Sequence, residues 1–174
     1  MKKTFKHFSS PRGFTLIEIL IVIGLLSVIG TISVAVITVT LRGAKKTDLL
    51  NFANQNGDAA LSQMVKNIRY AQTLNTPATC VPTTTVSSIT ITSFSDHQQT
   101  TYSCANNTIS SNSASLLDIN SLRVSSCSFV CSQASTLVPP IITIQFVLVP
   151  KTAGSFEETN FSLPFQSSVT LRNY

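Results

Sequence analysis

One long apolar segment near the N-terminus dominates the hydrophobic pattern of this chain. Residues 14–41 comprise 28 positions with a single charged side chain, Glu18. A helix rises about 1.5 Å per residue, so this segment would reach roughly 42 Å, which exceeds the roughly 30 Å hydrocarbon core of a bilayer. Residues 1–13 are basic and contain no acidic residue. Because basic residues favour the cytoplasmic side, the pattern predicts a single membrane-spanning helix whose C-terminal part is exported.

The positions after the apolar segment predict that the helix continues beyond the membrane. Proline is absent between Ala44 and Leu74, and small or apolar residues recur at the three-to-four spacing of one helix face. Pro77 closes this pattern. We therefore expect residues 42–76 to form an amphipathic helix whose apolar face packs against a sheet. The predicted apolar face consists of Ala53, Gly57, Ala60, Leu61, Met64, Val65, Ile68, Ala71 and Leu74.

The chain after Pro77 changes to short runs of β-branched and aromatic residues separated by Ser, Asn and Pro. Such runs predict strands, and strands that follow a helix rather than alternate with helices indicate an antiparallel α+β fold. We expect a long N-terminal helix packed on a β-rich globular head, residues 77–174, with an exposed loop at residues 106–115. The predicted strands are Val86–Thr92, Gln99–Cys104, Ser121–Cys131, Ile141–Val149 and Phe161–Arg172, the last with a break near Pro164 left open.

The net charge of +5 is concentrated at the N-terminus. If residues 1–13 are removed, eight basic residues face seven acidic ones, which leaves a charge of +1. A DNA-binding domain normally carries a basic stripe on one face. Outside the leader we find only two small basic clusters, which we interpret as a solvated helix face, and we keep DNA binding as a minor alternative. The leader carries Lys2, Lys3, Lys6 and Arg12, and the two clusters are Arg42 with Lys45 and Lys46, and Lys66 with Arg69.

Four cysteines lie in the part of the chain predicted to be exported: Cys80, Cys104, Cys127 and Cys131. An even number in an oxidising compartment predicts two disulfides. Zinc binding is the alternative, because Cys127-x3-Cys131 resembles half of a zinc site. The other two cysteines stand far apart, and His97 is the only histidine beyond the leader, which counts against zinc. Of the three pairings that four cysteines allow, we expect the local one, Cys80 with Cys104 and Cys127 with Cys131.

The junction between the basic and apolar segments reads Gly13-Phe14-Thr15-Leu16-Ile17-Glu18. This sequence resembles the cleavage and methylation signal of type IV prepilins and type II secretion pseudopilins, and the resemblance extends through residue 41. It implies that a prepilin peptidase in the membrane cuts after Gly13, and that Phe14 becomes an N-methylated N-terminus. The implied partners are other pilin or pseudopilin subunits, an assembly platform protein with its ATPase, and membrane lipid before assembly. No cofactor is implied.

Glu18 is the one charge within the apolar segment. A carboxylate at mid-span costs about 2.5–3.5 kcal/mol on an insertion scale, and less near the surface, so it needs a partner. The resemblance implies that Glu18 pairs with the terminal amine of Phe14 in a neighbouring subunit, which neutralises both charges and fixes the axial register of the two helices. The alternative is a charge close to the interface that reaches water in an ordinary membrane anchor.

One departure from the resembled families narrows the interpretation. Many major pilins carry a proline in the middle of this helix, whereas the present chain has none between Pro11 and Pro77. The resemblance therefore favours a minor pilin or minor pseudopilin, first anchored in the cytoplasmic membrane and then part of a periplasmic or cell-surface filament. Two rivals are a secreted domain, cut after Ala35 by a signal peptidase, and a single-span anchored binding protein that does not polymerise. The mature chain would begin at Phe14 if it is a pilin-like subunit, at Val36 if it is a secreted domain and at Met1 if it is an uncut anchor.

Sequence signatures of catalysis are absent. The chain contains no glycine-rich phosphate loop, no HExxH motif and no GxSxG motif. Asp118, Glu157 and Glu158 could accept a cation, but their spacing matches no calcium loop. We interpret these three residues as solvated loop charge, and we expect a structural subunit without a metal rather than an enzyme.

Overall fold

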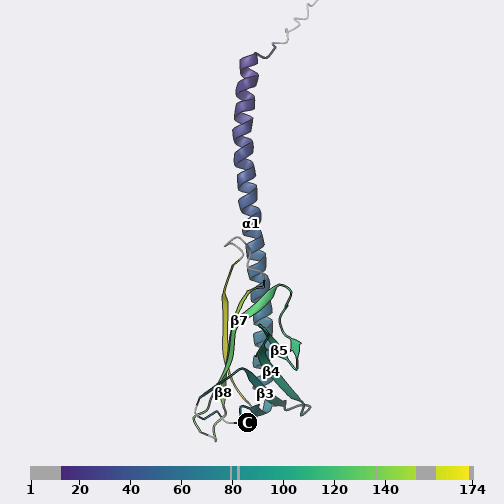
Figure 1. Cartoon of the computed structure of the whole chain (residues 1–174), viewed down its shortest axis with the longest axis vertical. Helices are drawn as coiled ribbons and strands as arrows, with labels where there is room; N and C mark the ends of the chain where they lie inside the picture. The colour runs from purple at the N-terminus through teal and green to yellow at the C-terminus, as the bar shows by residue number, and fades with distance from the viewer. Residues whose placement is uncertain (1–12, 79, 82, 136, 152–159, 173–174) are drawn as a thin grey trace, which may run out of the picture. The chain divides into compact units, whose positions relative to one another are not determined.

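The computed structural model describes residues 13–78, 80–81, 83–135, 137–151 and 160–172. These residues form one helix followed by nine strands. The chain divides into two compact units, residues 1–43 and residues 44–174, and each is described by itself. Figure 1 shows helix α1 (Leu16–Arg69) and, around its second half, the strands of the second unit.

The first unit contains the part of α1 that carries the apolar segment. Every large apolar residue from Phe14 to Leu41 is exposed, with exposed fractions between 47% and 77%. The mean hydropathy of this part reaches 2.7 over an 18-residue window. Its length and composition therefore allow it to cross a membrane.

In the second unit, α1 presents one face to the strands. The buried residues of this face recur at helical spacing and coincide with predicted apolar positions, so the predicted packing of the helix on a sheet is confirmed. Leu61 and Val65 flank the buried row and pack partly buried against the core. The buried helix residues are Ala53, Gly57, Ala60, Met64 and Ile68.

The helix ends earlier than the hydrophobic pattern predicts. Residues Ala71–Thr76 form strand β1, which pairs antiparallel with β3 (Ser88–Ser93). Ala71 is fully buried and Leu74 packs against the core. Both positions therefore face the core as predicted, but they belong to a strand and not to the helix. The prediction of a helix through residue 76 was wrong, because pairing with β3 satisfies the backbone groups that a longer helix would have satisfied internally.

The first sheet has five antiparallel strands in the order β1-β3-β4-β5-β6. Strand β4 spans Gln99–Ala105, β5 spans Thr108–Ser111 and β6 spans Ala114–Ser115. The predicted exposed loop at residues 106–115 is wrong, since this segment forms two tight hairpin turns and its Ile109 is fully buried. The four turn residues have the left-handed backbone conformation, which asparagine tolerates better than most residues. They are Asn106, Asn107, Asn112 and Ser113, with φ angles between 48° and 72°.

The second sheet has four antiparallel strands in the order β2-β7-β8-β9. Its strands are β2 (Thr84–Val86), β7 (Leu122–Ser132), β8 (Ile141–Pro150) and β9 (Leu163–Thr170). The strands predicted at 121–131 and 141–149 are confirmed to within one residue at each end. The last strand is shorter than predicted. It runs through Pro164 without a break, because β9 is an edge strand, in which the missing N–H donor of a proline can face solvent. The antiparallel α+β architecture is confirmed.

Side chains of β8 and β9 fill the space between the four-stranded sheet and α1. Alternate residues of β8 are buried. Phe146 of β8 stacks on Phe165 of β9 with ring centroids 5.1 Å apart and an interplanar angle of 14°. The Phe165 ring lies so close to Gly57 that a Cβ atom at position 57 would overlap it. The absence of a side chain at Gly57 therefore permits the close contact between helix and sheet.

Replacing Gly57 with alanine is expected to destabilise the second unit. Alanine gains about 1 kcal/mol in helix propensity. The added methyl group must displace the Phe165 ring, which is held by Phe146, and such overpacking typically costs about 1–3 kcal/mol. We expect the free energy of unfolding, measured by denaturant titration of the full chain in micelles, to fall by about 1 kcal/mol.

Two further variants control this experiment. Gly43→Ala adds a methyl group where no described atom lies within 4 Å, so it should cause no loss. In a Phe165→Leu background the loss caused by Gly57→Ala should shrink, because the smaller side chain leaves room for the methyl group. An equal loss in both backgrounds would contradict the contact between Gly57 and Phe165.

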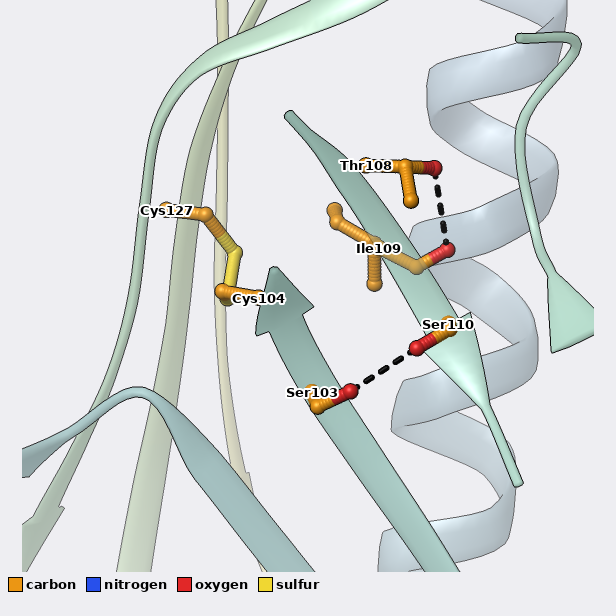
Figure 2. The surroundings of a disulfide bond; sticks show 6 residues. All are labelled: Ser103, Cys104, Thr108, Ile109, Ser110 and Cys127. Carbon is orange, nitrogen blue, oxygen red and sulfur yellow. Dashed lines mark hydrogen bonds between the residues drawn. A yellow bond between two sulfur atoms is a disulfide. The ribbon is translucent and has the colours of Figure 1, made fainter. Parts of the chain in front are cut away.

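Two disulfides join the elements of the second unit, as the four cysteines predict. Cys80 is bonded to Cys131, and Cys104 is bonded to Cys127. The expected local pairing was wrong. Cys127 and Cys131 lie four residues apart in β7, and an extended strand separates such Cα atoms by about 13 Å, beyond the roughly 7 Å that a disulfide tolerates. Figure 2 shows the Cys104–Cys127 bond, which links β4 of the five-stranded sheet to β7 of the four-stranded sheet.

Hydrogen bonds reinforce the place where the two sheets meet. The backbone N–H of Val124 donates to the Asn107 carbonyl at 2.7 Å, and the Asn107 side-chain amide donates to the Val124 carbonyl at 3.2 Å. Within the five-stranded sheet, the hydroxyls of Ser103 and Ser110 are 2.8 Å apart beside the disulfide (Figure 2). The β4–β5 hairpin is thus attached to β7 by one covalent bond and two hydrogen bonds.

Candidate assembly site at the N-terminal junction

Residues 13–15 precede the first helical residue, Leu16, and Thr15 caps the helix. The backbone N–H of Glu18 donates to the Thr15 side-chain oxygen at 3.3 Å and to the Thr15 carbonyl at 3.1 Å. Thr15 and Glu18 therefore occupy the two key positions of a Thr-x-x-Glu capping box. The hydrophobic pattern does not reveal this role of Thr15, although the Thr-x-x-Glu spacing signals it.

Glu18 lies in the first turn of α1, near the positive end of the helix dipole. Its side chain is exposed and forms no ion pair with another described residue. Phe14 and Glu18 line the same shallow hollow of about 180 Å³, together with Ile19, Val22 and Ile23. The two residues for which the resemblance implies a role in assembly therefore lie on one side of the helix.

The hydroxyl side chains of α1 within the apolar segment bond to the helix itself. Five hydroxyls donate to backbone carbonyls three or four residues earlier, at distances of 2.6–3.0 Å. Because these hydroxyls already have acceptors, the surface of this part of α1 suits lipid or other apolar helices. The five residues are Ser27, Thr31, Ser33, Thr38 and Thr40.

A comparison with known protein families gives a match that contains this junction. Residues 9–39 match the family model of the prokaryotic N-terminal methylation motif. The chain carries the type IV pilin and pseudopilin signature. No curated protein and no solved structure matches the chain. The resemblance seen in the sequence is confirmed for the N-terminal segment, and the matched range ends before the second unit begins.

The pilin signature supports a pilin-like or pseudopilin-like role, and the family that carries it is structural rather than enzymatic. Together with the apolar helix, it fits a single-pass anchor in the inner membrane with the head outside. The signature also implies interaction with other pilin subunits and processing by a prepilin peptidase. Gly13 and Phe14 lie within the matched range, immediately before the capping residue Thr15.

The acidic residues considered for cation binding form turn caps where the structure describes them. Asp118 accepts hydrogen bonds from the Asn120 backbone N–H at 3.0 Å and from the Ser121 hydroxyl at 2.9 Å. These hydrogen bonds stabilise the charged carboxylate and lower the pKa of Asp118, and the bond from the Asn120 backbone N–H has the largest effect. Glu157 and Glu158 lie outside the described residues. Among the residues that are described, no cluster of three or more His, Cys, Asp or Glu side chains could hold a metal ion.

Proposed function

We propose that the chain is a minor subunit of a type IV pilus or of a type II secretion-like pseudopilus. A prepilin peptidase cuts after Gly13, Phe14 is N-methylated, and an assembly ATPase with its platform protein moves the subunit from the membrane into a filament. The observation that carries the proposal is the match of residues 9–39 to the methylation motif at the start of an exposed apolar helix. The minor status is supported by α1 itself, which contains no proline from Leu16 to Arg69.

The position of Gly13 supports cleavage at this site. Gly13 and Phe14 lie before the first helical residue, so the peptide bond between them is in backbone that a peptidase can bind in extended form. A Cβ atom added at Gly13 meets no described atom within 4 Å. The fold itself therefore does not require glycine here, whereas the absence of a side chain would let the backbone enter the site of a peptidase closely.

Replacing Gly13 with leucine should leave the leader attached. A Cβ atom at position 13 meets no described atom within 4 Å, so we expect membrane insertion and folding not to change. The intact mass of protein extracted from membranes should then correspond to a chain that begins at Met1. Gly24→Leu is the matched control, because a Cβ atom added at Gly24 also meets no described atom within 4 Å beyond the local helix backbone. Gly24 lies inside the helix, so this variant should be cut normally. A Gly13→Leu chain that begins at Phe14 would contradict the assigned cleavage site.

Assembly would bury the exposed apolar helix among the helices of neighbouring subunits. Cleavage frees an α-amine at Phe14, and Glu18 lies about one helical turn away on the same side of α1. When two helices are displaced along their axes, the amine of one subunit meets Glu18 of the next. Opposite charges attract more strongly in an apolar environment than in water, so this pairing would fix the axial register of the subunits.

The experiment that tests the proposed function is the isolation of sheared filaments. Quantitative mass spectrometry should find the chain in the filament fraction at a small fraction of the abundance of the main subunit. Equal abundance would instead identify a major subunit. Retention of the whole protein in the membrane, or its release as a free domain, would overturn the proposal in favour of an anchored or secreted binding protein that does not polymerise.

A further inference from the structure

A groove of about 490 Å³ lies between the last turns of α1 and the hairpin formed by β3 and β4. Figure 1 shows β3 and β4 beside the C-terminal end of the helix. The volume falls within the range of roughly 300–1,000 Å³ that is typical of small-molecule sites. The wall on the helix side is formed by Lys66, Asn67 and Tyr70, and the buried Ile91 contributes from β3.

Two aromatic rings are exposed in this groove. Tyr70 follows the last helical residue and is 50% exposed, and Phe94 lies in the β3–β4 turn and is 58% exposed. Neither ring is needed to fill the core, so both present apolar surface that a ligand could cover. The face of an aromatic ring carries partial negative charge. Such a face attracts the weakly positive C–H groups on one side of a sugar ring.

Hydrogen-bonding groups surround the two rings. The Lys66 amine, the Tyr70 hydroxyl and the Thr100 hydroxyl all line the groove, and none of them bonds to another described residue. The Asp96 carboxylate accepts the Gln98 backbone N–H at 3.2 Å and also interacts with the Ser93 side chain. Because a carboxylate offers about four acceptor positions, it can still accept further hydrogen bonds. Donors and acceptors are therefore both available beside the rings.

The charges of the groove balance. Lys66 and Asp96 are its two charged residues, one of each sign. The carboxylate of Asp96 disfavours a phosphate or a nucleic acid, and the polar rim disfavours a purely apolar ligand. A neutral ring that carries hydroxyl groups satisfies all the observed features: it covers the aromatic faces, and its hydroxyls both donate and accept.

We propose that this groove binds a neutral saccharide. One sugar ring stacks on Tyr70 or Phe94, and its hydroxyls bond to Asp96 and Lys66. The Asn67 side chain donates to the Tyr102 hydroxyl at 2.6 Å, which fixes the helix wall to β4 and holds the groove in shape. This binding would give the exported head a ligand, and it does not depend on the role of the N-terminal helix in assembly.

Saturation-transfer NMR with methyl glycosides tests the proposal. The full chain, held in a detergent without a sugar headgroup, is mixed with the methyl glycosides of glucose, galactose, mannose and N-acetylglucosamine at millimolar concentration. At least one of them should receive saturation from the protein. Phe94→Ala and Tyr70→Ala together should weaken its binding by about tenfold or more. Asp96→Asn should weaken it as well, through the loss of a charged acceptor.

Phe52→Ala is the matched control, because Phe52 is a 37% exposed aromatic residue of α1 outside the groove. It should leave glycoside binding unchanged. The two groove aromatics are exposed, so their removal should leave the thermal unfolding temperature near that of the parent chain. Absence of saturation transfer to every glycoside would overturn the proposal. So would binding that persists without Tyr70 and Phe94, or preferential binding of inorganic phosphate.

Discussion

Replacing Glu18 with alanine should leave membrane insertion and cleavage intact but lower incorporation into filaments at least about tenfold. The variant leaves the Phe14 amine of a neighbouring subunit without a counter-charge among apolar helices. An unpaired charge in such a setting costs about 2.5–3.5 kcal/mol, and about 1.4 kcal/mol corresponds to a factor of ten. The measured quantity is the ratio of the subunit in sheared filaments to the subunit that remains in the membrane.

Two other variants separate charge pairing from helix capping. Thr15→Ala removes the capping oxygen but keeps the carboxylate of Glu18, so it should retain most of the incorporation if cleavage is normal. Asp48→Ala removes a carboxylate of α1 that lies outside the apolar segment, and it should have no effect. Normal incorporation of Glu18→Ala would defeat the register proposal. Equal defects in Thr15→Ala and Glu18→Ala would show that the carboxylate acts through the helix end.

Removing the Cys80–Cys131 disulfide by paired alanine substitutions should lower the free energy of unfolding by roughly 4 kcal/mol. This bond connects residues 51 positions apart, and the entropy that a cross-link removes from the unfolded chain grows with the length of the loop. Both cysteines are also buried in the core, with exposed fractions of 2% and 0%. Denaturant titration of the full chain in micelles measures the change.

The Cys104–Cys127 disulfide provides the comparison. It spans 23 positions, for which the same relation gives roughly 3 kcal/mol. Its two cysteines are only partly buried, and the hydrogen bonds between Asn107 and Val124 hold the same junction after the bond is lost. The first pair of substitutions should therefore be the more damaging. A larger loss from the second pair, or no loss from the first, would contradict this order.

Periodicity predicted the elements whose burial is one-sided and regular. The apolar face of the amphipathic helix was visible because Ala53, Ala60 and Met64 recur at helical spacing, and packing in the second unit buries these same residues. Strand β8 was visible because it is bounded by prolines and rich in β-branched residues. Periodicity could not place the helix end. Ala71 and Leu74 are three residues apart, which fits a helix face better than a regular strand. The structure nevertheless places them in β1, whose pairing with β3 is irregular between Ala71 and Thr73.

The disulfide pairing illustrates a different limit. Which sulfur meets which depends on how the two sheets pack, and no local pattern reports that packing. One pair could nevertheless have been excluded from the sequence. Residues 121–131 read as a strand, and two cysteines four residues apart in one strand are too distant to bond. The strand prediction thus implies separate partners for Cys127 and Cys131, as the structure has them.

The two candidate sites differ in how much the sequence reveals of them. The N-terminal junction is contiguous, so its glycine, its phenylalanine and the lone carboxylate are read directly from residues 13–18. The groove beside the helix end is assembled from α1, β3 and β4. Tyr70 and Phe94 are 24 positions apart and become neighbours only because β1 turns back from the helix and pairs with β3. No spacing within the chain signals that proximity.

The mature N-terminus tests the central claim most directly. Intact-mass and N-terminal peptide analysis of the protein extracted from its host should find a chain that begins at Phe14 with a methylated amine. That result would show that the apolar helix starts with the free amine that pairing with Glu18 requires. A chain that begins at Met1 would be an uncut anchor, and one that begins at Val36 would be a secreted domain. Either result would contradict assembly through this junction.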